Sequence, residues 1–134
     1  MLQRLMSAMT VFAALLTVSP QPASACSCRQ RNPAESFAEA TDVFEGRVIS
    51  LRQNGGEYIT EFEVLRRWKG MRRVRATIRR DGAAVFCGIT FAPGASYIIY
   101  ATNVHNELRV LPCSRSRPTN DATDDLRSLG PPRS

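Results

Sequence analysis

At residues 58–64 the chain reads Tyr-Ile-Thr-Glu-Phe-Glu-Val, a pattern typical of a β-strand. Every second residue from Tyr58 to Val64 is apolar or a strand former, and two of the three residues between them are Glu. Because side chains along a strand point alternately to its two faces, this pattern predicts a half-buried strand. We expect the strand to run from Tyr58 to Trp68 and to end at Gly70.

Strand signals continue on both sides of this stretch. Residues 41–51 are rich in strand formers, and the turn signal Gln53-Asn54-Gly55-Gly56 separates them from residue 58. Gly46 interrupts that run and predicts a bulge or a sharp bend. On the carboxyl side we expect a strand with one wet face over residues 73–79, a short extended piece over 83–87, the most buried strand over 97–101 and a fifth strand over 108–111.

Helices are expected only near the ends of the mature chain. Asn32-Pro33-Ala34-Glu35 has the residue types of a helix start and predicts a helix over residues 33–40. A second helix is expected over 120–129, stopped by Gly130. Five strands without strand–helix–strand alternation predict an all-β fold, a small five-stranded antiparallel barrel, with a flat sandwich as the alternative. The Pro-, Arg- and Ser-rich tail, about residues 118–134, is expected to be partly flexible.

The first 25 residues have the order of a secretory signal peptide. Arg4 is the only charge before residue 29, a mostly apolar run extends from Leu5 to Val18, and the small residues Ala23-Ser24-Ala25 follow. This run is shorter than the roughly 20 residues of a spanning helix. We therefore predict a signal peptide over residues 1–25 and one exported domain over 26–134, secreted or periplasmic, without a transmembrane segment. A lipid anchor on Cys26 is the alternative, although Ala23 stands where lipoprotein signals carry Leu.

The chain is strongly basic, but its charged side chains are not expected to gather on one face. The chain carries 18 Lys and Arg against 12 Asp and Glu, and the densest basic stretch runs from Arg66 to Arg80. On strands these charges would point to opposite faces, and Trp68 is the only aromatic residue among them, where single-strand binders offer several stacking rings. The stretch predicts a solvated edge or hairpin and no nucleic-acid partner.

Four cysteines occur, Cys26, Cys28, Cys87 and Cys113, and an even number in a short exported chain predicts disulfides. A Cys26–Cys28 ring would constrain almost nothing, so each of these two is expected to pair with one of the distant cysteines. Each such bond should stabilise the fold by about 4 kcal/mol in the chain-entropy model. Cys-x-Cys with His105 could also bind a metal, but His105 is the only histidine. We expect no metal of its own and no cofactor.

No combination of residues argues for catalysis. His105 lacks an evident nucleophile partner, and the carboxylate pairs Glu61/Glu63 and Asp124/Asp125 are expected to be solvated. We therefore expect no enzyme. Two function classes remain: a module that presents its N-terminus to a partner protein, and a structural module in which the disulfides only stabilise the fold.

Several short motifs together resemble a known family. They are Cys26-Ser27-Cys28 directly after the signal site, Thr41-Asp42-Val43-Phe44-Glu45-Gly46-Arg47-Val48, Trp68-Lys69-Gly70, Cys87-Gly88, the Gly94–Ala101 segment, and Cys113-Ser114-Arg115-Ser116-Arg117-Pro118. This set resembles the netrin-like domain family, and within it the tissue inhibitors of metalloproteinases and their bacterial relatives. The resemblance implies an OB-type five-stranded barrel with disulfides Cys26–Cys87 and Cys28–Cys113.

The resemblance also implies a mode of action. In the inhibitors, the amine and carbonyl of the first cysteine chelate the zinc of a target metalloprotease, and the next residue enters its specificity pocket. Here these residues would be Cys26 and Ser27. The chain departs from the animal inhibitors because it lacks a third barrel disulfide and the C-terminal subdomain, and because Arg29-Gln30-Arg31-Asn32-Pro33 replaces their proline-rich segment. The alternative is a non-inhibitory structural or protein-binding module of the envelope or extracellular space.

Overall fold

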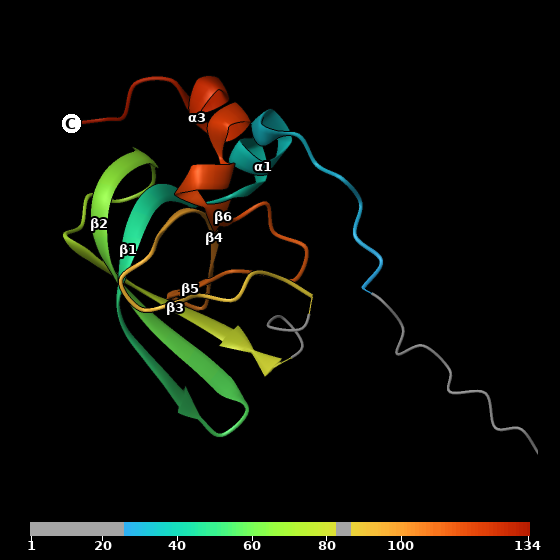
Figure 1. Cartoon of the computed structure of the whole chain (residues 1–134), viewed down its shortest axis with the longest axis vertical. Helices are drawn as coiled ribbons and strands as arrows, with labels where there is room; N and C mark the ends of the chain where they lie inside the picture. Colours follow the sequence, from blue (N-terminus) through green and yellow to red (C-terminus); the bar gives the residue numbers. More distant parts are fainter. Residues whose placement is uncertain (1–25, 83–86) are drawn as a thin grey trace, which may run out of the picture.

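The computed structural model describes residues 26–82 and 87–134 (Figure 1). The predicted signal peptide and most of the extended piece expected at 83–87 lie outside the described residues. The described strands are β1 (Asp42–Asn54), β2 (Glu57–Lys69), β3 (Arg75–Asp81), β4 (Ser96–Val104), β5 (Glu107–Arg109) and β6 (Arg117–Pro118). The alternation at residues 58–64 thus belongs to β2, as predicted.

The strands form one sheet that closes on itself. Its order is β1-β2-β3-β5-β4-β6, and β1 also pairs with β4, so that β1, β2, β3, β5 and β4 form a ring. The all-β class, the OB-like ring of strands and the two disulfides are as predicted, whereas the flat sandwich is excluded.

One expectation about this ring is wrong: the barrel is not antiparallel throughout. β3 and β5 pair in parallel, through Ile78–Leu108 and Arg79–Arg109, while the other pairs are antiparallel. The reason is parity. Strand directions can alternate around a closed ring only if the number of strands is even, so a ring of five must contain a parallel pair.

β1 bends where Gly46 was expected to mark a bulge. The register of β1 against β2 shifts between Glu45 and Gly46, and again on either side of it. A Cβ at Gly46 would lie 2.9 Å from the ring of Phe62. The missing side chain therefore lets β1 pass close to the core while it turns from β4 toward the β1–β2 hairpin.

Two apolar clusters lie on opposite sides of the sheet. The first fills the ring and includes Phe44, Phe62, Phe91 and Tyr97, whose rings pack edge to face. The second lies between the sheet and the helices and is built around Val43, Trp68, Ile98 and Tyr100, with Ala40 and Ala122 from the helical side. β4 contributes to both clusters, and its residues 97–101 are all buried, as predicted.

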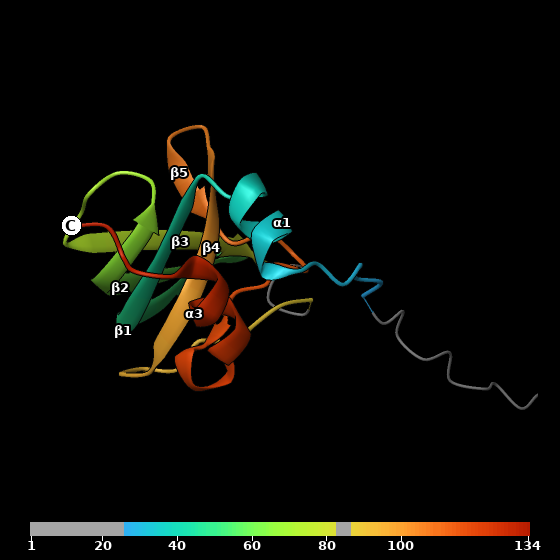
Figure 2. The ribbon, with the colours of Figure 1, turned by 90° about the horizontal axis from the view of Figure 1, so that it is seen from above.

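Two short helices cover this second cluster and contact each other (Figure 2). Helix α1 (Pro33–Glu39) begins at Asn32, whose side chain accepts a hydrogen bond from the Glu35 amide at 2.8 Å. A 3₁₀ turn, η1 (Thr119–Asp121), precedes helix α3 (Thr123–Leu129). Both helices lie where they were predicted, within a few residues. Within residues 26–82 and 87–134, no helix has the length and apolar character that a membrane span requires.

The C-terminal tail makes defined contacts, which its composition did not predict. The indole Nε1 of Trp68 donates to the Gly130 carbonyl at 2.8 Å. The Arg133 amide donates to the Arg67 carbonyl at 2.7 Å, and Arg67 donates to Ser134. These bonds hold the end of the chain against β2.

Candidate functional site

The N-terminal segment, residues 26–32, is the part of the molecule on which the predicted function depends. All seven residues are exposed, and none belongs to a helix or strand. Cys26 and Ser27, the predicted binding residues, therefore lie on the surface. An exposed segment without secondary structure normally frays, so its geometry depends on what ties it to the ring.

Two disulfides tie the segment, in the pairing that the family resemblance implies. Cys26 is bonded to Cys87 and Cys28 to Cys113, with Cα–Cα distances of 5.3 and 5.4 Å. The two distant cysteines are neighbours, because the Cys113 amide donates to the Cys87 carbonyl at 3.1 Å. Ser27 is thus held between two bonds that end on adjacent backbone.

Arg115 provides a third attachment, which was not expected from the sequence. Its Nη1 donates to the Arg31 carbonyl at 2.9 Å. Its Nε and Nη2 bind both oxygens of Asp125, at 2.6 and 3.1 Å. A fork of this kind fixes the guanidinium in direction as well as position. The end of the N-terminal segment is therefore connected to helix α3 through Arg115.

Asp125 is fully buried, and this corrects the expectation that Asp124 and Asp125 are a solvated pair. Only Asp124 is exposed, at 76% of its side chain, against 0% for Asp125. The buried carboxylate also accepts a hydrogen bond from the Tyr100 hydroxyl at 2.8 Å. The signal was helical spacing, since Asp125 follows Ala122 by three residues and precedes Leu129 by four, on the face that packs against the sheet.

The tyrosine in this cluster is held in its neutral form. Burial raises the pKa of Tyr100, and the hydrogen bond that its hydroxyl donates to Asp125 raises it further. The neutral hydroxyl is required here because a phenolate could not donate to the carboxylate. Tyr100, Asp125 and Arg115 therefore act as one unit across β4, α3 and the loop before β6.

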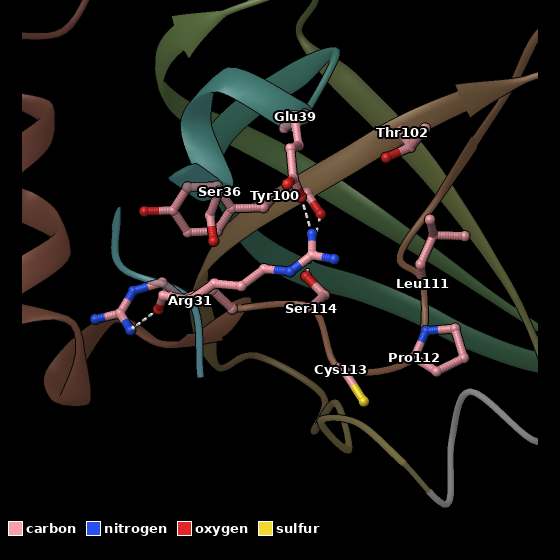
Figure 3. Close-up of a pocket in the computed structure, with 11 residues that line it drawn as sticks. Arg31, Ser36, Glu39, Tyr100, Thr102, Leu111, Pro112, Cys113 and Ser114 are labelled. Carbon is pink, nitrogen blue, oxygen red and sulfur yellow. Dashed lines mark hydrogen bonds and ion pairs between the residues drawn. The ribbon is translucent and has the colours of Figure 1, made fainter. Parts of the chain in front are cut away.

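A pocket of about 330 Å³ lies beside the N-terminal segment, between α1, β4 and residues 111–115. Figure 3 shows the guanidinium of Arg31 reaching across it to the carboxylate of Glu39, with which it forms an ion pair. Cys113 and Pro112 line the opposite side. A partner residue that entered this pocket would have to displace the ion pair. The pocket therefore offers a polar surface beside the N-terminal segment.

The remaining candidate residues lie elsewhere. His105 lies in the turn between β4 and β5, in a left-handed conformation. Across residues 26–82 and 87–134, no three side chains of His, Cys, Asp or Glu come together as a metal site. Glu61 and Glu63 pair with Arg75 and Arg47 on the outside of the ring.

Half of the cations in the basic stretch pair with carboxylates, namely Arg66, Arg73, Arg75 and Arg79. Arg66 pairs with Glu45, and Arg73 pairs with Asp42. On the outer face, Arg79 and Arg109 share Glu57 and Glu107, in a quartet that connects β2, β3 and β5. Among the described residues, Arg67, Lys69 and Arg80 of this stretch donate to backbone carbonyls instead. The stretch is therefore not a continuous row of free cations for a phosphate backbone.

The sequence matches no family model, and no curated protein matches it significantly.

Proposed function

We propose that the mature protein is an exported binding module that presents Cys26 and Ser27 to the active site of a zinc metalloprotease. The proposal rests on one observation: an exposed tripeptide, Cys26–Cys28, is fixed by two disulfides that end on neighbouring backbone. The target class comes from the family resemblance alone. Cleavage after Ala25, which makes Cys26 the first residue, is part of the proposal.

The chemistry of such a terminus suits a catalytic zinc. A zinc protease keeps one coordination position open for water. An α-amine has a pKa of about 7.7–8.0, so a useful fraction of it is neutral near pH 7 and can replace that water. The adjacent carbonyl supplies a second ligand atom. Neither atom gives the protease a bond that it can readily cleave while the disulfides hold the segment in place.

The anchoring lowers the cost of binding. A free terminus must be ordered when it enters an active site, and each ordered residue costs free energy. Here Cys26 and Cys28 are bonded to the ring, and Arg115 holds the Arg31 carbonyl. Ser27 is small and polar, so we expect weak or selective inhibition of proteases with a deep apolar pocket.

The test compares two proteins that differ by one residue. Mature protein with Cys26 as its authentic first residue is assayed against a panel of zinc metalloproteases. The second protein carries one additional Ala before Cys26, which moves the amine away from the metal without touching the ring or the disulfides. We expect the first protein to inhibit at least one protease and the extended protein to inhibit none.

A second comparison isolates the amine. Chemical acetylation of the α-amine of Cys26 keeps all residues and both disulfides. It converts the amine into an amide that is not basic, and inhibition should be lost. As a matched control, Arg127→Ala changes an exposed residue of α3 and should inhibit as the parent does. If no form inhibits any protease, or all inhibit equally, the zinc mechanism is wrong and a structural or protein-binding role without inhibition becomes the better account.

A further inference from the structure

A second cavity, separate from the N-terminal segment, opens at the end of the ring where the β1–β2 hairpin begins. Its volume is about 310 Å³, and its walls come from β1, β2, β3 and the loop before β4. Leu51, Tyr58 and Phe91 make most of this lining apolar, Thr60 and Thr90 add hydroxyls, and Arg52 and Gln53 lie at the exposed side. It shares no residue with the pocket beside Cys113.

A buried guanidinium forms one wall of this cavity. Arg80 lies on the inner face of β3, in line with Ala76 and Ile78, and only 4% of it is exposed. Its Nη1 donates to the Ile89 carbonyl, and its Cζ lies 4.2 Å from the centre of the Phe91 ring. Tyr58 is its cross-strand neighbour on β2.

This cation has no carboxylate partner among the described residues. Asp and Glu residues pair with other arginines of the ring, but Arg80 makes none of those ion pairs. Its Nε is buried and has no hydrogen-bond partner in the described part of the chain. Burial also lowers the pKa of Arg80, because removal from water disfavours the charged form. A buried charge without a counter-charge is costly, and a ligand that supplied one would remove that cost.

We propose that this cavity binds a small monocarboxylic acid with an apolar body, its carboxylate on Arg80 and its body against Leu51, Tyr58 and Phe91. One negative charge matches the one buried cation, and the fork of a guanidinium fits a carboxylate. At about 30 Å³ for each water-sized group, the volume accommodates a ligand on the order of ten non-hydrogen atoms. This site is independent of the proposed role of Cys26.

The experiment uses octanoate as the acid and 1-octanol as its neutral counterpart of the same length. Binding to the full mature protein is followed by backbone amide chemical shifts and by the thermal midpoint, which rises when a ligand binds only the folded state. We expect octanoate to move the signals of residues 51–60, 80 and 89–91, and octanol to bind about tenfold more weakly or worse, because a charge-assisted hydrogen bond is lost.

Two variants separate the buried cation from the exposed one. Arg80→Met keeps an unbranched apolar stem in place of the stem of the arginine and removes the unpaired buried charge, so the variant should fold and should bind octanoate no better than octanol. Arg52→Gln removes the cation at the exposed side and should keep most of the preference for the acid. Should Arg80→Met fail to fold, the comparison of octanoate with octanol on the wild-type protein decides alone.

The outcomes that overturn the proposal are equally specific. They are no octanoate binding at millimolar concentration, equal binding of acid and alcohol, signal changes outside the cavity, or an unchanged preference in Arg80→Met. An acetylated dipeptide ending in Leu tests the other source of such a carboxylate. If it binds in the cavity and octanoate does not, the site takes a peptide terminus and the assignment to a free acid is wrong.

Discussion

Gly46 is the residue on which the bend of β1 depends. The strand pairs with β4 along its first half and with β2 from Val43 to Asn54, so it turns sharply while it stays in contact with the core. A methyl group at this position would meet two atoms of Phe62 and one of Phe44 at 2.9–3.0 Å. Neither ring can retreat freely, because both lie in the apolar cluster that fills the ring.

Gly46→Ala should therefore lower the free energy of unfolding by about 1–3 kcal/mol, the usual cost of overpacking a core. Chemical denaturation measures it. Gly56→Ala is the matched control, since nothing lies within 4 Å of the added carbon, and it should be neutral or slightly stabilising. Equal effects of the two substitutions would contradict the role assigned to Gly46.

Tyr100 gives the protein a specific sensitivity to alkali. Its pKa is raised in the folded protein, whereas in the unfolded chain it is near 10. Above pH 10 the unfolded state therefore binds fewer protons than the folded state, and the free energy of unfolding falls, by about 1.4 kcal/mol for each pH unit. Below pH 10 the contribution is fully present.

In Tyr100→Phe this component of the alkaline loss should disappear. The variant starts lower at pH 8 because Asp125 loses one hydrogen bond, and its stability should then fall less steeply above pH 10 than that of the parent. Denaturation at several pH values between 8 and 11 gives both slopes. Parallel curves would show that the Tyr100 hydroxyl does not retain its proton.

Among the elements, helix α3 supports the N-terminal segment through a buried carboxylate. It brings a carboxylate with no exposed surface against Arg115, and Arg115 in turn holds the Arg31 carbonyl. The helix has seven residues, too few for stability alone, so it depends on this pair and on its apolar face. The ion pair of Asp125 with Arg115 and the fold of helix α3 therefore stabilise each other.

Asp125→Ala should cost about 3–5 kcal/mol, because it leaves the Arg115 guanidinium largely buried without its counter-charge. Asp124→Ala, one residue earlier and largely exposed, should change the stability by less than about 0.5 kcal/mol. Urea unfolding of the two variants side by side provides the measurement. A small loss in Asp125→Ala would mean that water replaces the carboxylate and that Arg115 is not fixed by it.

The elements themselves could be largely predicted from the sequence, because alternation, turn residues and helix caps are local signals. The parallel pairing of β3 with β5 was not expected, because no residue of either strand indicates it; it follows from the closure of a ring with an odd number of strands. Asp125 and Arg80 were missed for a related reason. Their residue types favour solvent, and only the position that each takes on its helix or strand, Asp125 beside Arg115 and Arg80 beside Phe91, shows that they are buried.

In the molecule as a whole, the two disulfides attach the N-terminal segment to the chain at Cys87 and Cys113, which the pairing of the strands does not do. They close loops with sequence separations of 61 and 85 residues, both of which contain β1, β2 and β3. No strand of the ring includes any of the four cysteines. We therefore expect the ring to form without the disulfides, and the geometry of residues 26–28 to depend on them.

Replacing Cys28 and Cys113 together by Ser should lower the free energy of unfolding by about 2–5 kcal/mol and leave the β-rich circular dichroism spectrum intact. The Cys26 and Cys87 pair should behave in the same way, and the two losses should not simply add, because the loops overlap. A change below about 1 kcal/mol, or loss of the ring itself, would contradict this separation of roles.

Because the number of strands is odd, the ring closes through one parallel junction, between β3 and β5. At the parallel junction the backbone contributes only the short pairing of Ile78–Arg79 with Leu108–Arg109, and two arginines are brought side by side. Glu57 and Glu107 bridge them from outside, so ion pairs contribute to the closure of the ring there beside the short ladder. Salt screens such groups. The ring should thus open first at the β3–β5 junction, and more readily at high salt than in dilute buffer. Native-state hydrogen exchange at Leu108 would detect this opening.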